Sequence, residues 1–224
     1  MFWNLIKLNL LFCLFALPSG ALLAAGLFTP LGIAGMIFSI VLAFPIGGAC
    51  CACMFCLSKM IRRDPGYLWF DFKRKFLENF KQAAAPGILC TLFIYVQVFL
   101  WLDLMNKGAD IALIVAGVVT FIIFMMVAPY IFLQIAYIKL TTSQILGNSL
   151  LISFGNAGRS FASALGGSVV WAVFLLLLPG SMPFSPLLLV FGFSISWLLS
   201  LMCIWPPVDR QFSIEESLRR QREE

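Results

Sequence analysis

Long apolar runs with almost no charge constrain this chain more than any other feature. Residues 111–138, for example, contain no charged side chain. Of the 224 residues, 62% are hydrophobic and only 11% are charged, and the mean hydropathy is +1.00. A water-soluble domain needs a more polar exterior, whereas lipid covers an apolar one. The sequence therefore predicts a single membrane domain over residues 1–224, with the lipid bilayer as its surroundings.

The apolar runs predict an all-α fold, a polytopic bundle of about six transmembrane helices. A helix needs about 20 apolar residues to cross a hydrocarbon core of about 30 Å. We expect a kink or an interruption of the first helix at Pro18. The second run either breaks at Pro45 or tilts, so residues 4–58 form two full spans or include a broken or re-entrant helix. The predicted spans are residues 4–28, 31–58, 84–102, 111–138, 161–178 and 185–204.

A charged segment between the second and third predicted spans has a helical pattern. At about 100° per residue, its aromatic residues fall on one side and most of its charges on the other. We expect residues 67–82 to form an amphipathic cytoplasmic helix whose aromatic stripe is buried against lipid or the bundle. The stripe consists of Trp69, Phe72, Phe76 and Phe80. Pro206-Pro207 predicts the end of the sixth span, followed by a polar tail over residues 205–224.

The distribution of basic residues predicts the orientation. With six spans, 14 of the 15 lysine and arginine residues face one side, and only Lys107 faces the other. The positive-inside rule places the fourteen, and both termini, in the cytoplasm. These basic residues flank apolar spans, as is typical of membrane topology and contact with anionic lipid, so no nucleic-acid partner is expected.

The densest chemical feature is a group of four cysteines at Cys50, Cys51, Cys53 and Cys56. A Cys-x-x-Cys spacing can bind a soft metal or take part in redox chemistry. Because no second pair and no histidine accompany it, small packing residues are the favoured interpretation. Motifs for nucleotides, metals and activated serines are absent, as is the commonest general base. The sequence predicts a non-enzymatic protein with no catalytic residue, metal or cofactor.

Other polar and small residues are candidates for interactions. Asp103 would suit a proton or ion site if it lay within the membrane, but a solvated helix end is the favoured alternative. Polar residues within the spans are expected to bridge helices: Gln97, Thr120, Tyr130, Gln134 and Tyr137. Small residues around the fifth span form either a partner interface or internal packing, two alternatives of equal weight. The candidate residues there are Gly155, Gly158, Arg159, Gly166 and Gly167.

Several short motifs carry a resemblance to a known family. The stretch Tyr67-Leu68-Trp69-Phe70-Asp71-Phe72, followed by Asn79-Phe80-Lys81-Gln82, resembles the YesL-like family of bacterial integral membrane proteins. Asn9-Leu10-Leu11, Leu17-Pro18 and Leu102-Asp103-Leu104 look like further motifs of that family, whereas residues 19–48 are longer and richer in glycine. Family members are typically of unknown function and often encoded near carbohydrate uptake systems. The resemblance thus implies a bacterial cytoplasmic membrane and identifies no site residue.

Three functions follow from these observations. The favoured one is an accessory protein that partners the membrane subunits of a sugar importer, as the resemblance implies. The alternatives are a small transporter in its own right and a lipid-facing membrane enzyme that uses carboxylates. A transporter needs polar or charged groups that converge in mid-membrane, and the sequence shows no such set. The substrate and the oligomeric state are left open.

Overall fold

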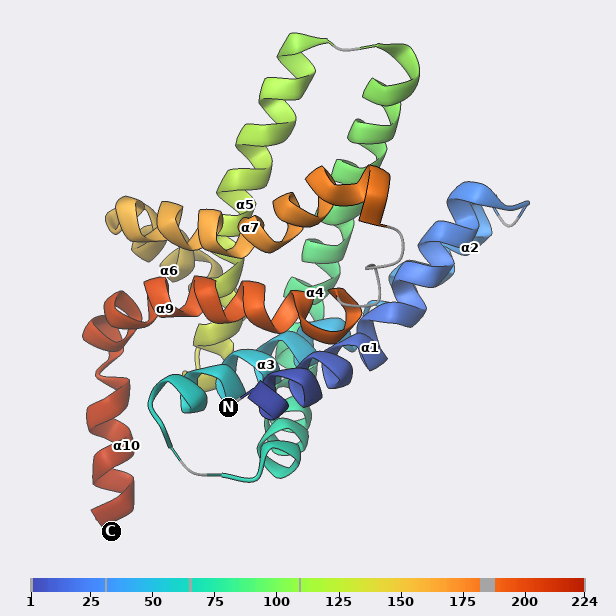
Figure 1. Ribbon diagram of the computed structural model, residues 1–224. Coiled ribbons are helices and arrows are strands. Elements are labelled where there is room, and N and C mark those ends of the chain that lie inside the picture. Colours follow the sequence, from blue (N-terminus) through green and yellow to red (C-terminus); the bar gives the residue numbers. More distant parts are fainter. Residues whose placement is uncertain (1, 31, 65, 109, 182–187, 224) are drawn as a thin grey trace.

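The computed structural model describes residues 2–223 apart from residues 31, 65, 109 and 182–187 (Figure 1). Every secondary-structure element in these ranges is a helix, which confirms the predicted all-α fold. The helices are α1 Phe2–Phe28, α2 Gly32–Leu42, α3 Ile46–Ile61, α4 Leu68–Lys107, α5 Ile111–Tyr137, α6 Thr142–Gly155, α7 Ala157–Ser181, the π-helical turn η2 Leu188–Gly192, α9 Phe193–Phe212 and α10 Ile214–Glu223.

Four helical segments of the described chain are long and apolar enough to cross a membrane: Phe2–Leu27, Leu68–Lys107, Ile111–Tyr137 and Val190–Phe212. A fifth crossing arises if α2 and α3, which are bent by 43° at the break between them, form one span. The break lies between Leu42 and Ile46, so residues 31–58 follow the broken-helix alternative. Residues 185–187 of the predicted sixth span, and the side chains of residues 171–178 of the fifth, lie outside the described part. The expected count of about six spans is not confirmed.

Two predicted helix boundaries were wrong. The amphipathic helix over 67–82 and the span over 84–102 are parts of one 40-residue helix, α4. The alanines before Pro86 are the strongest helix formers, so the helix continues into the membrane segment. Likewise, α9 continues past Pro206 and Pro207 to Phe212. The expected interruption at Pro18 does not occur, because α1 is one helix that contains this proline, and the alternative of a kink there stays a prediction. Packing against neighbouring helices supports a proline within a membrane helix.

Helix α3 is the centre of the bundle. It contacts α1, α4, α5 and α9, and every residue from Gly47 to Ser58 is buried. A helix that is apolar on all sides is suited to a position away from water, and here neighbouring helices cover it. Glycine, alanine and cysteine fill the first half of this stretch, and such small residues let several helices approach one axis. The four clustered cysteines lie in this stretch, buried and without disulfides.

Two pairs of helices cross at glycines. An added Cβ at Gly47 of α3 would lie 1.9 Å from the carbonyl oxygen of Ala83 in α4. A Cβ at Gly87 of α4 would lie 2.6 Å from the backbone nitrogen of Gly47. The α1–α2 hairpin, which projects at the right of Figure 1, has a second crossing at Gly26 and Gly35, where an added Cβ would lie 2.9 Å from the partner backbone. These backbones approach as closely as they do because no side chain separates them.

Hydrogen bonds between polar side chains join the helices further. Gln97 bonds Thr120 at 2.9 Å between α4 and α5, and Gln134 bonds Ser149 at 2.9 Å between α5 and α6. Tyr130 bonds Ser160 at 3.0 Å between α5 and α7. The prediction that these polar residues bridge helices is confirmed, since a polar group inside a bilayer needs a partner within the protein.

Candidate functional site

Charged residues gather where α3 ends, α4 begins and α5 ends. We call this region the charged end of the bundle and define it by Lys59, Arg62, Asp71, Tyr137 and Trp205. The sequence places Lys59 and Arg62 within one turn of each other on α3, and Asp71 in the first turn of α4. A carboxylate is favourable there because the helix dipole is positive at the N-terminus.

Asp71 is the acidic centre of this region. It is buried, its Oδ2 lies 2.7 Å from the Lys59 ammonium, and its Oδ1 lies 3.5 Å from the Arg74 guanidinium. The loop residue Gly66 covers the pair, because a Cβ there would lie 2.5 Å from both the Asp71 Oδ2 and the Lys59 Nζ. The ion pair therefore links α3 to α4, with the loop packed directly over it.

Arg62, at the end of α3, begins a chain of contacts that reaches three other helices. Its guanidinium donates to the Tyr137 hydroxyl at 3.0 Å and lies 5.3 Å from the centre of the Trp205 ring. Tyr137 also bonds Ser58 on α3. The Trp205 indole donates to the Glu215 carboxylate at 3.2 Å, and the Asp209 carboxylate accepts the Glu215 amide at 2.8 Å. This chain of contacts connects α3, α5, α9 and α10, so the tail helix is held against the bundle.

The chemistry of the charged end is that of a clamp. Its carboxylate is paired with cations and its hydroxyls are bonded. The described residues include no group of three or more histidine, cysteine, aspartate or glutamate side chains placed to hold a metal ion. The arrangement holds the ends of the helices in position.

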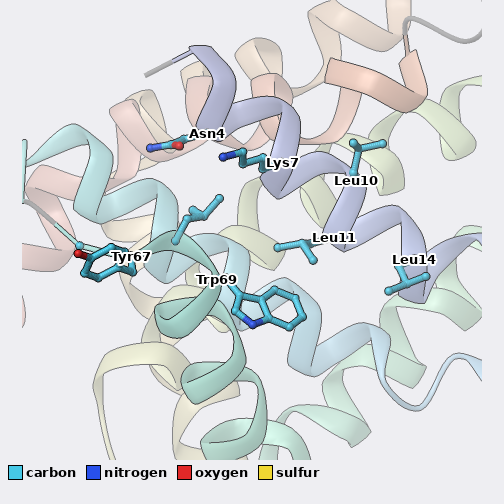
Figure 2. Close-up of a pocket in the computed structure, with 9 residues that line it drawn as sticks. Asn4, Lys7, Leu10, Leu11, Leu14, Tyr67 and Trp69 are labelled. Atoms are coloured by element: carbon cyan, nitrogen blue, oxygen red, sulfur yellow. The ribbon is translucent and has the colours of Figure 1, made fainter.

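A groove opens beside the charged end, between α1 and the start of α4. Figure 2 shows Lys7 and Leu11 of α1 across from Tyr67 and Trp69. Its volume is about 610 Å³. We call it the α1–α4 groove, and it is lined by Asn4, Lys7, Leu10, Leu11, Leu14, Gly66, Tyr67, Leu68 and Trp69.

The aromatic stripe predicted for residues 67–82 divides in two. Phe72 is buried, and Phe76 stacks on Phe15 of α1 with ring centres 4.6 Å apart. Phe80 meets Phe44, in the bend between α2 and α3, edge to face at 5.1 Å. Trp69, in contrast, is 62% exposed and lines the groove. The first turn of α4 extends beyond the helices that cover the rest of the stripe.

The candidate residues around the fifth predicted span fall into a packed group and an exposed group. Gly167 is buried, and a Cβ there would meet the Ser200 hydroxyl oxygen of α9 at 2.5 Å, while Gly166 lies against Leu199. Gly155 and Gly158 are exposed with open space above them, and Arg159 is exposed as well. Asp103 is half exposed and pairs with Lys107 at 2.8 Å, at the tip of the α4–α5 hairpin.

Sequence reasoning missed the charged end as a unit. It located the charges of residues 59–82 but not their partners Tyr137 and Trp205, which belong to distant apolar runs. The only local signal was that Arg62, Tyr137 and Trp205 each lie near the end of such a run, where aromatic and basic residues meet the membrane surface.

Comparisons with known proteins return no relatives. The chain matches no protein-family model, no curated protein and no solved structure.

Proposed function

We propose that this chain is a non-enzymatic accessory protein of the bacterial cytoplasmic membrane that binds the membrane subunits of a carbohydrate importer. The observation that carries the partner role is an exposed surface where α6 meets α7. The carbohydrate class rests on the resemblance of residues 67–82 to the YesL-like family. The two parts are tested separately below.

The exposed surface, which we call the α6–α7 corner, consists of Leu151, Phe154, Gly155, Gly158 and Arg159. The Leu151 side chain is 74% exposed and that of Phe154 is 56% exposed. No atom outside the local backbone lies within 4 Å of a Cβ added at either glycine. Glycines with open space let the backbone of a second helix approach closely, and arginine is enriched at interfaces. The corner has the composition of a helix-docking surface.

The proposed topology puts this corner at the cytoplasmic side. The bent α2–α3 pair and the 25-residue helix α7, added to the four candidate spans, give six crossings. An even number with the observed distribution of lysine and arginine favours both termini in the cytoplasm. Helix α6 then lies at the cytoplasmic surface, because it follows directly after α5, the fourth crossing. A capping box formed by Thr141 and Gln144 marks its start.

A cross-linking experiment tests the partner role. A photoreactive amino acid replaces Gly158 in cells that express the protein, and Gly20 of α1 is the matched control, because it also has open space around it. We expect the Gly158 variant to capture the membrane subunit of a carbohydrate importer, identified by mass spectrometry, and the Gly20 variant not to do so. Equal capture at both positions, or capture of lipid alone at Gly158, would contradict the proposal.

Uptake measurements test the functional class. Deleting the gene should lower the uptake of one carbohydrate and leave growth on glucose unchanged. The purified protein alone in liposomes should move no sugar. Sugar transport by the protein alone would replace the accessory role with that of a small transporter.

A further inference from the structure

One face of α1 remains uncovered by the rest of the bundle. Positions spaced by three, four and seven residues share a face of a helix, which places Asn4, Lys7, Leu11 and Leu14 in one row. The neighbouring face, which includes Leu5, Leu8 and Phe12, is buried in the core. The uncovered row forms one wall of the α1–α4 groove, and the first turn of α4 forms the other (Figure 2).

The groove has an unbalanced positive charge. Lys7 is the only charged residue among those that line it. Among the described residues, no ion pair includes Lys7, or Lys73, which lies one turn after Trp69 on α4. The neighbouring Lys59 is neutralised by Asp71. An occupant that complements this groove therefore carries negative charge at the end near Lys7.

Polarity changes along the groove. Asn4, Lys7 and Tyr67 supply polar groups at one end, and Leu10, Leu11 and Leu14 supply only apolar surface toward the other. From Lys7 to Leu14 the helix advances by about 10 Å, which is about a third of the hydrocarbon thickness of a bilayer. Tyrosine and tryptophan at such a boundary are typical of the level of the lipid headgroups.

We propose that the α1–α4 groove binds an anionic phospholipid. The phosphate lies at the Lys7 ammonium, Trp69 and Tyr67 flank the headgroup and glycerol region, and the acyl chains follow Leu10, Leu11 and Leu14. A soluble sugar or phosphate would leave the leucine half of the groove unmatched. A zwitterionic phospholipid would add a positive headgroup beside an ammonium that forms no ion pair among the described residues. The site is independent of the proposed importer partner.

Lipid retention measured by native mass spectrometry tests this site. The full chain is purified in detergent, delipidated, and titrated with dioleoylphosphatidylglycerol or dioleoylphosphatidylcholine. We expect preferential retention of phosphatidylglycerol by the unmodified protein. Lys7→Gln should reduce the affinity for phosphatidylglycerol by about fivefold, the effect of one lysine near an anionic surface. Lys107→Gln, at the far tip of the α4–α5 hairpin, is the matched control and should change nothing, while melting temperatures verify that both variants fold.

Two further arms identify the occupant. Leu10→Trp narrows the apolar part of the groove and should weaken the binding of phosphatidylglycerol without removing Lys7. Soluble glycerol 3-phosphate should fail to displace the lipid. Equal retention of the two lipids, an unchanged affinity in Lys7→Gln, or displacement by glycerol 3-phosphate would overturn the proposal. So would a protein adduct, rather than a lipid adduct, from a photoreactive residue at Leu14 in cells.

Discussion

The crossing of α3 and α4 yields a quantitative prediction. Gly47→Ala places a methyl group 1.9 Å from the carbonyl oxygen of Ala83, and this neighbour is backbone in a long helix, so a side-chain rotation cannot relieve the clash. The two helices must separate along a contact that is central to the bundle. Overpacking of this kind costs about 1–3 kcal/mol.

The matched control is Gly20→Ala in α1, where an added Cβ meets nothing within 4 Å. Alanine favours a helix over glycine by about 1 kcal/mol, and this gain applies to both variants. The difference between them therefore isolates the cost of packing. For a chain of about this length, each kcal/mol shifts the melting temperature by about 2–4 °C, so Gly47→Ala should melt about 2–12 °C below Gly20→Ala.

Thermal unfolding in one detergent, followed by tryptophan fluorescence and by size-exclusion chromatography of heated samples, measures this difference. The reasoning fails if Gly47→Ala melts at the same temperature as Gly20→Ala or above it. Gly87→Ala, on the opposite side of the same crossing, provides an independent check, because its methyl group would meet the backbone of Gly47.

Three further predictions concern the charged end, the tail and the topology. Asp71→Asn should lower the free energy of unfolding by about 1.5–3 kcal/mol, because Lys59 loses its charged partner in a largely buried site. Asp103→Asn, in an exposed pair, should change the free energy of unfolding by less than about 1 kcal/mol, and equal effects of the two variants in thermal unfolding would contradict this reasoning. Asp209→Ala removes the acceptor of the Glu215 amide, so limited trypsin digestion should cleave the tail faster than in the unmodified protein, and an unchanged rate would mean that this bond does not hold α10. Reporter fusions at Met1 and Glu224 should be active in the cytoplasm and one at Asn106 outside; a Met1 fusion active only outside would remove the six-span topology.

Helix type could be predicted from the sequence because apolar runs of this length have no other stable form in a membrane. Helix boundaries could not. The charge pattern suggested a boundary between residues 82 and 84, and Pro206-Pro207 suggested the end of the last span, yet α4 and α9 continue through both places. The local sequence indicates how much a proline destabilises an isolated helix. Whether the helix continues through the proline depends on the helices that pack around it. Pro86 and Pro207 are both buried, which is information that only the assembled bundle contains.

The candidate sites show the same limit. The periodicity of residues 67–82 grouped Trp69 with Phe72, Phe76 and Phe80, and the helix does place them along one side. Which of them is covered depends on where α1 and the bend after α2 end relative to α4. Phe15 contacts Phe76 and Phe44 contacts Phe80, but neither of these two rings contacts Trp69. The periodicity within one helix predicts which residues share a face, but it does not predict which of them the neighbouring helices cover.

The two uncovered surfaces differ in the occupant that they favour, and this difference follows from their residues. At the α6–α7 corner, glycines with open space and exposed apolar side chains suit the close approach of a second helix. In the α1–α4 groove, aromatic residues and an unpaired lysine stand above a leucine wall, which suits a molecule with one charged end and a long apolar remainder. A helical partner in that groove would bury the Lys7 ammonium, which is costly unless the partner supplies a carboxylate. A phospholipid brings its own phosphate and leaves the ammonium at the membrane surface.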